Sequence, residues 1–313
     1  MSSEAPQPNR TSSRSVYRLR PLLNQAIRES SIETLQSVLA TARIEVPSYS
    51  DYLRQVLQIT VFRGSVQLAT YLLSEERVPV SNLSCTTVAN VPSIELFKVL
   101  LAHGWDINSQ DENPGSFQKG GRVIHWVLKN EEMVRWLLDH GARVDFEAEV
   151  DLELLIDWPV PILEDCAGIG SFSTFKLLME RGAKVTRRTL HRAVEEAASV
   201  GADPEQGGME RERVDEYTRQ REMIVRYLVD ELKLDVNQLD TDVNRGWLHF
   251  GTPINYAARR ENGARVVEWL LEKGADPRIK CLEEPGIDAE RYARMCGSEE
   301  VVELILRWKR EHG

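Results

Sequence analysis

The sequence lacks the features of membrane and secreted proteins. It has no apolar run near the roughly 20 residues that cross a bilayer. Its first residues contain no apolar core of the kind that marks a secretory signal. We therefore expect a cytoplasmic protein that does not associate with membranes. A nuclear location is not excluded by these features.

Cysteines are few and do not form a recognisable pattern. The four are Cys85, Cys166, Cys281 and Cys296, and none belongs to a C-x-x-C pair. No cysteine–histidine spacing resembles a zinc site, so no metal is predicted. This usage favours a reducing compartment.

The chain is also poor in clustered positive charge. Its formal net charge is −10, and no dense stripe of lysine and arginine is present. Binding to nucleic acid depends on such a stripe, so nucleic acid is not an expected partner. An acidic chain instead favours a partner protein with a basic surface.

Common catalytic motifs are missing as well. The sequence contains no G-x-S-x-G elbow, no phosphate-binding P-loop and no H-E-x-x-H helix. AGIG at 167–170 is too short for a dinucleotide fingerprint. Two acids precede Cys166, and they are expected to raise its pKa and make the thiol unreactive. No cofactor is predicted.

What the sequence does contain is a short helical pair, GTPINYAARRENGARVVEWLLEKGADP at 251–277. Thr252 and Pro253 are typical of a helix start. The aliphatic residues from Val266 to Leu271 share one face of a second helix, and Gly274 predicts a left-handed end. A pair of such short helices has an apolar surface on both sides and needs stacked copies of itself to bury them.

Copies of the second helix recur along the chain, each with an aliphatic triplet. Their middle residues are Val38, Leu72, Leu100, Leu137, Leu178, Leu228, Leu270 and Ile305. Subtracting neighbours gives steps of 34, 28, 37, 41, 50, 42 and 35 residues. Periods of this size indicate a repeat protein.

The repeats resemble the ankyrin family. TPINYAA at 252–258 is similar to the family's TPLHLAA, and LLEKGAD at 270–276 is similar to its LLxxGAD. The resemblance implies an all-α ankyrin-repeat solenoid of about eight helix-turn-helix repeats over residues 21–313, as a single domain. Residues 1–20 are read as a disordered tail. The family usually binds proteins and seldom catalyses reactions.

Four insertions enlarge the connections between helices, at 109–121, 145–161, 199–220 and 237–251. The resemblance implies that three of them are finger loops beside the concave face, and that 199–220 lies at the opposite edge. ERERVDEYTRQ at 210–220 is expected to lengthen a helix.

Aromatic side chains gather in or near the finger loops, where they could anchor a partner. The candidate binding residues are Trp105, Phe117, Asp157, Trp158, Trp247, His249 and Phe250. The alternative is that these rings pack the long loops onto the helices below them.

Two carboxylates fall where the resemblance implies an inner helix. Glu164 and Asp165 end a stretch, 145–165, that has eight acids and no lysine or arginine. A buried carboxylate needs a partner, so each is expected to be paired or open to the groove. His125 and His191 occupy the family's TPLH histidine and are expected to bond to backbone.

Two hypotheses of function follow. The first is a non-catalytic scaffold that grips a partner protein with its concave face and aromatic fingers. The alternative is an unusual ankyrin-fold enzyme or small-molecule binder, acting on an organic metabolite in an enclosed groove. In that case Glu164, Asp165 and His249 are the candidate acid–base residues.

Overall fold

The computed structural model describes residues 10–110, 121–144, 160–199, 211–241, 249–282 and 286–313. Every regular element within these ranges is a helix. The chain divides into two compact units, which are described separately below. Unit 1 extends to Val127 and includes Asp139–Ala142, whereas unit 2 comprises Leu128–Leu138 and Arg143–Gly313.

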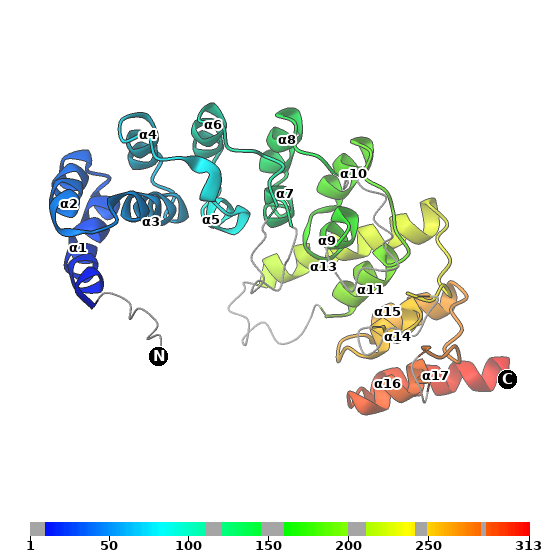
Figure 1. Ribbon diagram of the computed structural model, residues 1–313. Coiled ribbons are helices and arrows are strands. Elements are labelled where there is room, and N and C mark those ends of the chain that lie inside the picture. The colour runs from blue at the N-terminus through cyan, green and yellow to red at the C-terminus, as the bar shows by residue number, and fades with distance from the viewer. Residues whose placement is uncertain (1–9, 111–120, 145–159, 200–210, 242–248, 283–285) are drawn as a thin grey trace, which may run out of the picture. The chain divides into compact units, whose positions relative to one another are not determined.

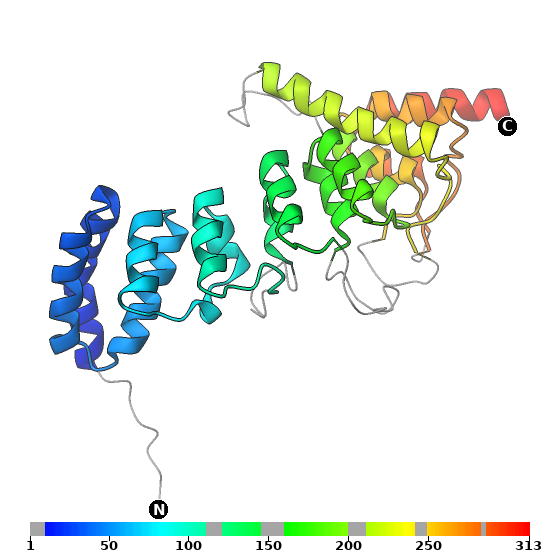
Figure 2. The same cartoon turned by 90° about the horizontal axis from the view of Figure 1, so that it is seen from above.

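Unit 1 is a stack of helical pairs. Its helices are α1 (Arg10–Glu29), α2 (Ile32–Glu45), α3 (Tyr49–Phe62), α4 (Val66–Ser74), the short η1 (Val80–Asn82), α5 (Cys85–Ala89), α6 (Ile94–Ala102) and α7 (Val123–Trp126). The first helices α3, α5 and α7 pack in one row, and the second helices α2, α4 and α6 pack in another. Figures 1 and 2 show these helices lying side by side.

Unit 2 repeats this two-row arrangement. Its helices are α8 (Glu131–Asp139, whose last residue belongs to unit 1), α9 (Ile162–Ile169), α10 (Phe172–Glu180), α11 (Thr189–Ser199), α13 (Arg211–Arg226), the π-helical turn η2 (Tyr227–Glu231), α14 (Pro253–Ala258), α15 (Ala264–Glu272), α16 (Ala289–Met295) and α17 (Glu299–His312). The first helices α9, α11, α14 and α16 pack in sequence. The second helices α13 and α15 both pack on α11.

The aliphatic triplets form the core, as the sequence predicts. The eight middle residues named above all lie in helices, and each is at most 1% exposed. An apolar side chain buried on this scale stabilises the fold by about 1.5–3 kcal/mol. The triplet at 227–229 differs in one respect, because it lies in the π-helical turn η2 rather than in an α-helix.

Glycines end four of the second helices in the predicted left-handed conformation. Gly104, Gly141, Gly182 and Gly274 have φ angles of 86°, 94°, 94° and 89°. At three of these helix ends, the amide of the residue after the glycine donates a hydrogen bond to a carbonyl oxygen in the last turn. For example, Ala275 N donates to Leu270 O at 2.9 Å. These bonds satisfy carbonyl groups that the helix end would leave open.

Two details of the helix starts differ from the sequence-based predictions. Thr252 is the N-cap residue of α14, as its position predicts, but its buried hydroxyl makes no capping bond to the described backbone. Its neighbour Gly251 has a φ of 100°, and a side chain there would meet Asn255 Nδ2 at 2.6 Å. At the other end of the chain, α1 already begins at Arg10, which differs from the disordered tail expected over residues 1–20.

The insertion at 199–220 contributes a long helix. The prediction that its second half lengthens a helix is confirmed, because α13 begins at Arg211. This helix packs against α9, α10 and α11 and lies along one side of them in Figure 2. The hypothesis of a single domain over residues 21–313 stays a prediction.

Candidate functional site

Five charged side chains form a network on the first helices of unit 2. We call Arg192, Glu195, Glu196, Arg259 and Arg260 the arginine–glutamate network. Glu195, on α11, is 8% exposed and pairs with three guanidinium groups: Arg192 at 3.2 Å, Arg259 at 3.7 Å and Arg260 at closer range. Arg192 also reaches Glu196 at 3.0 Å. The network therefore ties α11 to the end of α14.

The arginines of this network remain accessible from solvent. Their side chains are 40%, 25% and 37% exposed for Arg192, Arg259 and Arg260, respectively. Arg259 Nη1 and Arg260 Nε have no hydrogen-bond partner among the described residues. Both atoms are buried, so the donors that these groups can offer to a ligand lie on the solvent-exposed parts of the three guanidinium groups.

Next to the network lies a ring cluster that contains two of the predicted site residues. Phe250 packs edge-on against Tyr256 at 5.2 Å and Tyr292 at 6.0 Å, and the guanidinium carbon of Arg259 lies 3.2 Å from the centre of its ring. His249 Nδ1 is 3.5 Å from a carboxylate oxygen of Asp240. The described end of the finger 237–251 thus packs on the helices below it.

Asp240 holds this cluster together. Its carboxylate accepts hydrogen bonds from the Tyr256 hydroxyl at 2.6 Å and from the Phe250 amide at 2.9 Å. Burial, followed by the neighbouring Asp240 carboxylate, raises the pKa of the Tyr256 hydroxyl. Tyr256 therefore keeps its proton, and its role here is to donate a hydrogen bond.

Glu164 is buried in α9, and it has the partner that burial requires. The hydroxyl of Thr186 donates to Glu164 Oε1 at 2.5 Å. Burial raises the pKa of the Glu164 carboxyl, whereas the bond from Thr186 and the nearby Arg188 and Arg192 act in the opposite direction. Asp165, the next residue, is half-buried.

Glu164 and His249, two of the three acid–base candidates, contact different partners in the described part of the chain. Glu164 bonds to Thr186, whereas His249 lies beside Asp240. A carboxyl with a raised pKa is suited to general acid catalysis, but it also needs a substrate within hydrogen-bond reach. The enzyme alternative therefore stays a hypothesis.

The histidine of the TPLH position is confirmed as a structural residue in one repeat. His191 is 1% exposed, and its Nε2 lies 2.9 Å from Gln238 O while its Nδ1 lies 3.0 Å from Arg187 O. Burial lowers the pKa of His191, which favours the neutral ring. The corresponding His125 is half-buried.

Trp105 differs from the exposed anchor expected of it. In unit 1 its side chain is 4% exposed, stacks on Phe97 at 6.2 Å and donates to Leu83 O at 3.4 Å. The ring therefore fills the core under the loop, which is the alternative that sequence reasoning left open. Four other candidates lie outside the described residues: Phe117, Asp157, Trp158 and Trp247.

The thiol of Cys166 is buried and its pKa is raised, as the sequence predicts, but for a different main reason. Burial raises the pKa of its thiol to about 12, and the nearby Asp165 contributes less than burial does.

Within the described ranges, no group of three or more histidine, cysteine or acidic side chains could hold a metal ion. None of the described helices is both long and apolar enough to span a membrane.

Comparison with known proteins identifies one repeat, which carries part of this site. The family model "Ankyrin repeat" matches residues 251–282. The chain contains an ankyrin repeat at these residues. The matched repeat contains α14 and α15, and with them Arg259, Arg260 and Tyr256.

Solved ankyrin-repeat domains show weaker likenesses to the chain. The human ASB11 ankyrin repeat domain is 19% identical, with a TM-score of 0.42 over 69% of this chain and 78% of that one. An ankyrin repeat domain from Acinetobacter baumannii AYE is 15% identical, with a TM-score of 0.38 over 81% and 97%. No curated protein matches the chain. The number of repeats stays a prediction.

Sequence reasoning missed the residues at the centre of this site. No role was predicted for Glu195, Arg259 or Arg260, and Asp240 falls only within the predicted finger 237–251. A signal was available for two of them, because Arg259 and Arg260 directly follow the TPINYAA motif. The pairing of α11 with α14 places Glu195 within their reach, and no local pattern encodes that pairing.

Proposed function

We propose that this protein binds a partner protein, using the first helices of unit 2. The contact surface comprises the arginine–glutamate network together with His249 and Phe250. Ankyrin repeats serve generally as scaffolds for protein interactions, and stacked repeats present extended surfaces for such contacts.

The single observation that carries this proposal is the preorganisation of Glu195 and its arginines. Three guanidinium groups converge on one nearly buried carboxylate, and one of them also covers the ring of Phe250. Ordering a flexible arginine on binding costs about 0.5–1.5 kcal/mol, and side chains that are already held avoid much of this cost. Arginine and aromatic residues are also the usual centres of binding energy.

The charge of the whole chain supports a partner with a basic surface. On α9, α11, α14 and their flanking residues the charges nearly balance, so local recognition rests on hydrogen bonds and ring contacts. The net charge of −10 acts over longer distances and speeds the approach of a cationic protein. We propose that Phe117, Trp158 and Trp247 add aromatic contacts from the fingers.

Site-specific photo-crosslinking in cells tests the proposal. A benzophenone amino acid replaces Glu196 within the network or, as the control, the exposed Glu303 on α17. We expect one protein to be crosslinked from position 196 and not from position 303. Equal crosslinking of the same proteins from both positions would contradict a binding surface at the network.

A further inference from the structure

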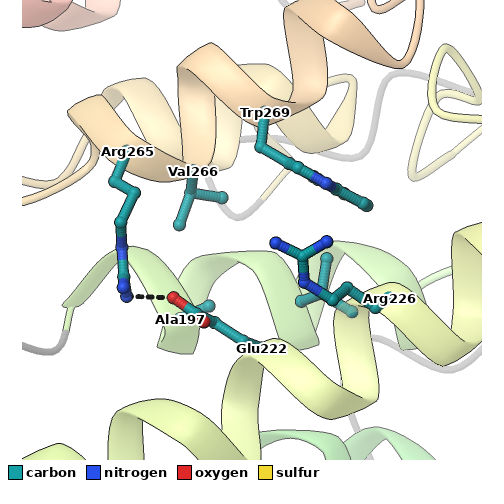
Figure 3. A pocket seen from close by; sticks show the side chains of 7 residues that line it. Ala197, Glu222, Arg226, Arg265, Val266 and Trp269 are labelled. Atoms are coloured by element: carbon teal, nitrogen blue, oxygen red, sulfur yellow. Dashed lines mark ion pairs between the residues drawn. The ribbon is translucent and has the colours of Figure 1, made fainter.

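A pocket opens between two second helices of unit 2, apart from the residues assigned to partner binding. Its volume is about 120 Å³. α13 and α15 form its walls and α11 contributes one residue, as Figure 3 shows. The lining residues are Ala197, Glu222, Val225, Arg226, Arg265, Val266 and Trp269.

The interior of the pocket is apolar and small. Ala197, Val225 and Val266 are 3%, 2% and 6% exposed, and the half-buried indole of Trp269 completes the apolar lining. An apolar cavity of about 150 Å³ in another protein is large enough for benzene. The volume here therefore suits one ring or one branched aliphatic group.

The rim of the pocket carries a guanidinium group, that of Arg226, for which the described residues supply no ion pair. Arg265 pairs with Glu222 across the opening, as the dashed line in Figure 3 shows. Arg226 lies with its guanidinium carbon 5.4 Å from the centre of the Trp269 ring. The described residues provide no carboxylate for Arg226, which is exposed to solvent. Its donors are thus available beside the apolar interior.

The backbone next to Arg226 is also unusual. The π-helical turn η2 begins at Tyr227, directly after Arg226, and π turns inside helices occur frequently at functional sites. Lys273 on α15 reaches Asp230 in this turn at 2.6 Å and lies 5.3 Å from the centre of the Trp269 ring. These contacts join the two walls beside the pocket.

We propose that this pocket binds a small organic carboxylate with a compact apolar body. The apolar body lies between Val225, Val266 and Trp269, and the carboxylate pairs with the guanidinium of Arg226. A guanidinium stacked on an aromatic ring keeps its edge free for two parallel hydrogen bonds to a carboxylate. This assignment does not depend on the proposed partner protein.

The test uses phenylacetate as the probe, with the full-length protein followed by NMR. Saturable shifts are expected at the valine methyls of Val225 and Val266 and at the indole N–H of Trp269, with a Kd on the order of 1 mM. The uncharged analogue phenylacetamide should bind about five-fold more weakly, because it has no charge to pair with Arg226.

Two variants make the test specific. Arg226→Gln removes the charge at an exposed position and should weaken phenylacetate binding about five-fold while leaving phenylacetamide unchanged. Arg291→Gln, an exposed arginine on α16, is the matched control and should bind both compounds as the wild type does. The proposal is overturned if the pocket resonances do not saturate up to about 10 mM, if the amide binds equally well, or if Arg226→Gln has no effect.

Discussion

Arg221 Nη1 donates to the carbonyl oxygen of Ala167 at 2.7 Å, which joins the inserted helix α13 to the end of α9. The Arg221 side chain is 1% exposed and lies 4.9 Å from the centre of the Tyr217 ring. Tyr217 in turn donates to Gly168 O at 2.8 Å. A cation at the carboxyl end of a helix also interacts favourably with the helix dipole.

Because of these contacts, Arg221→Ala should destabilise the protein by about 2–4 kcal/mol, since it leaves a cavity and unpaired carbonyl groups. The exposed Arg219→Ala on the same helix is the control and should change stability by less than about 0.5 kcal/mol. Urea denaturation followed by circular dichroism measures both. Equal stability of the two variants would show that Arg221 does not anchor α13.

Glu164 makes the stability of the fold depend on pH. Its pKa is raised in the folded state by burial, so its contribution is complete below the unfolded pKa and is lost as the pH rises through the folded pKa. Glu164→Gln keeps an oxygen that can accept the Thr186 hydroxyl. The variant should therefore gain stability relative to the wild type as the pH rises from about 4.5 towards 8.

Thermal unfolding of both proteins across this pH range measures the difference. Asp165→Asn, at the half-buried neighbouring position, serves as a comparison. A constant difference in stability between Glu164→Gln and the wild type at every pH would contradict the raised pKa.

Thiol reactivity should divide the four cysteines into two classes. Cys296 is exposed, whereas Cys85, Cys166 and Cys281 are buried. Iodoacetamide at pH 8 should modify Cys296 alone in the folded protein and all four after unfolding, because alkylation requires an accessible thiolate. Peptide mass spectrometry identifies the modified residues. Rapid modification of Cys166 in the folded protein would contradict its burial and its raised pKa.

Glu195 should contribute more to stability than an exposed carboxylate does. Glu195→Gln leaves three guanidinium groups without their shared anion, and because these groups are partly solvated the expected loss is about 1–2 kcal/mol. Glu303→Gln on the exposed side of α17 should be neutral. Urea denaturation provides the comparison, and equal midpoints would show that the network adds nothing to stability.

The sequence predicted the repeat scaffold well and the site only in part. Triplets such as Leu270 with its neighbours, and stops such as Gly274, are local patterns whose physical consequences do not depend on the rest of the fold. Trp105 shows the limit of such local patterns, because its ring could be an exposed binding anchor or could fill the core under a loop. Its packing against Phe97 shows that it fills the core. The pairing of Glu195 with Arg260 spans 65 residues and depends on which helices stack together.

The most direct test of the proposed function is the Kd of the crosslinked partner for purified Arg260→Gln, compared with Glu303→Gln. Arg260 is 37% exposed, so its replacement should leave the fold intact, which circular dichroism checks. We expect Arg260→Gln to weaken binding about tenfold and Glu303→Gln to leave it unchanged. A partner that binds both variants with the affinity of the wild type would contradict the claim that the arginine–glutamate network is its contact surface.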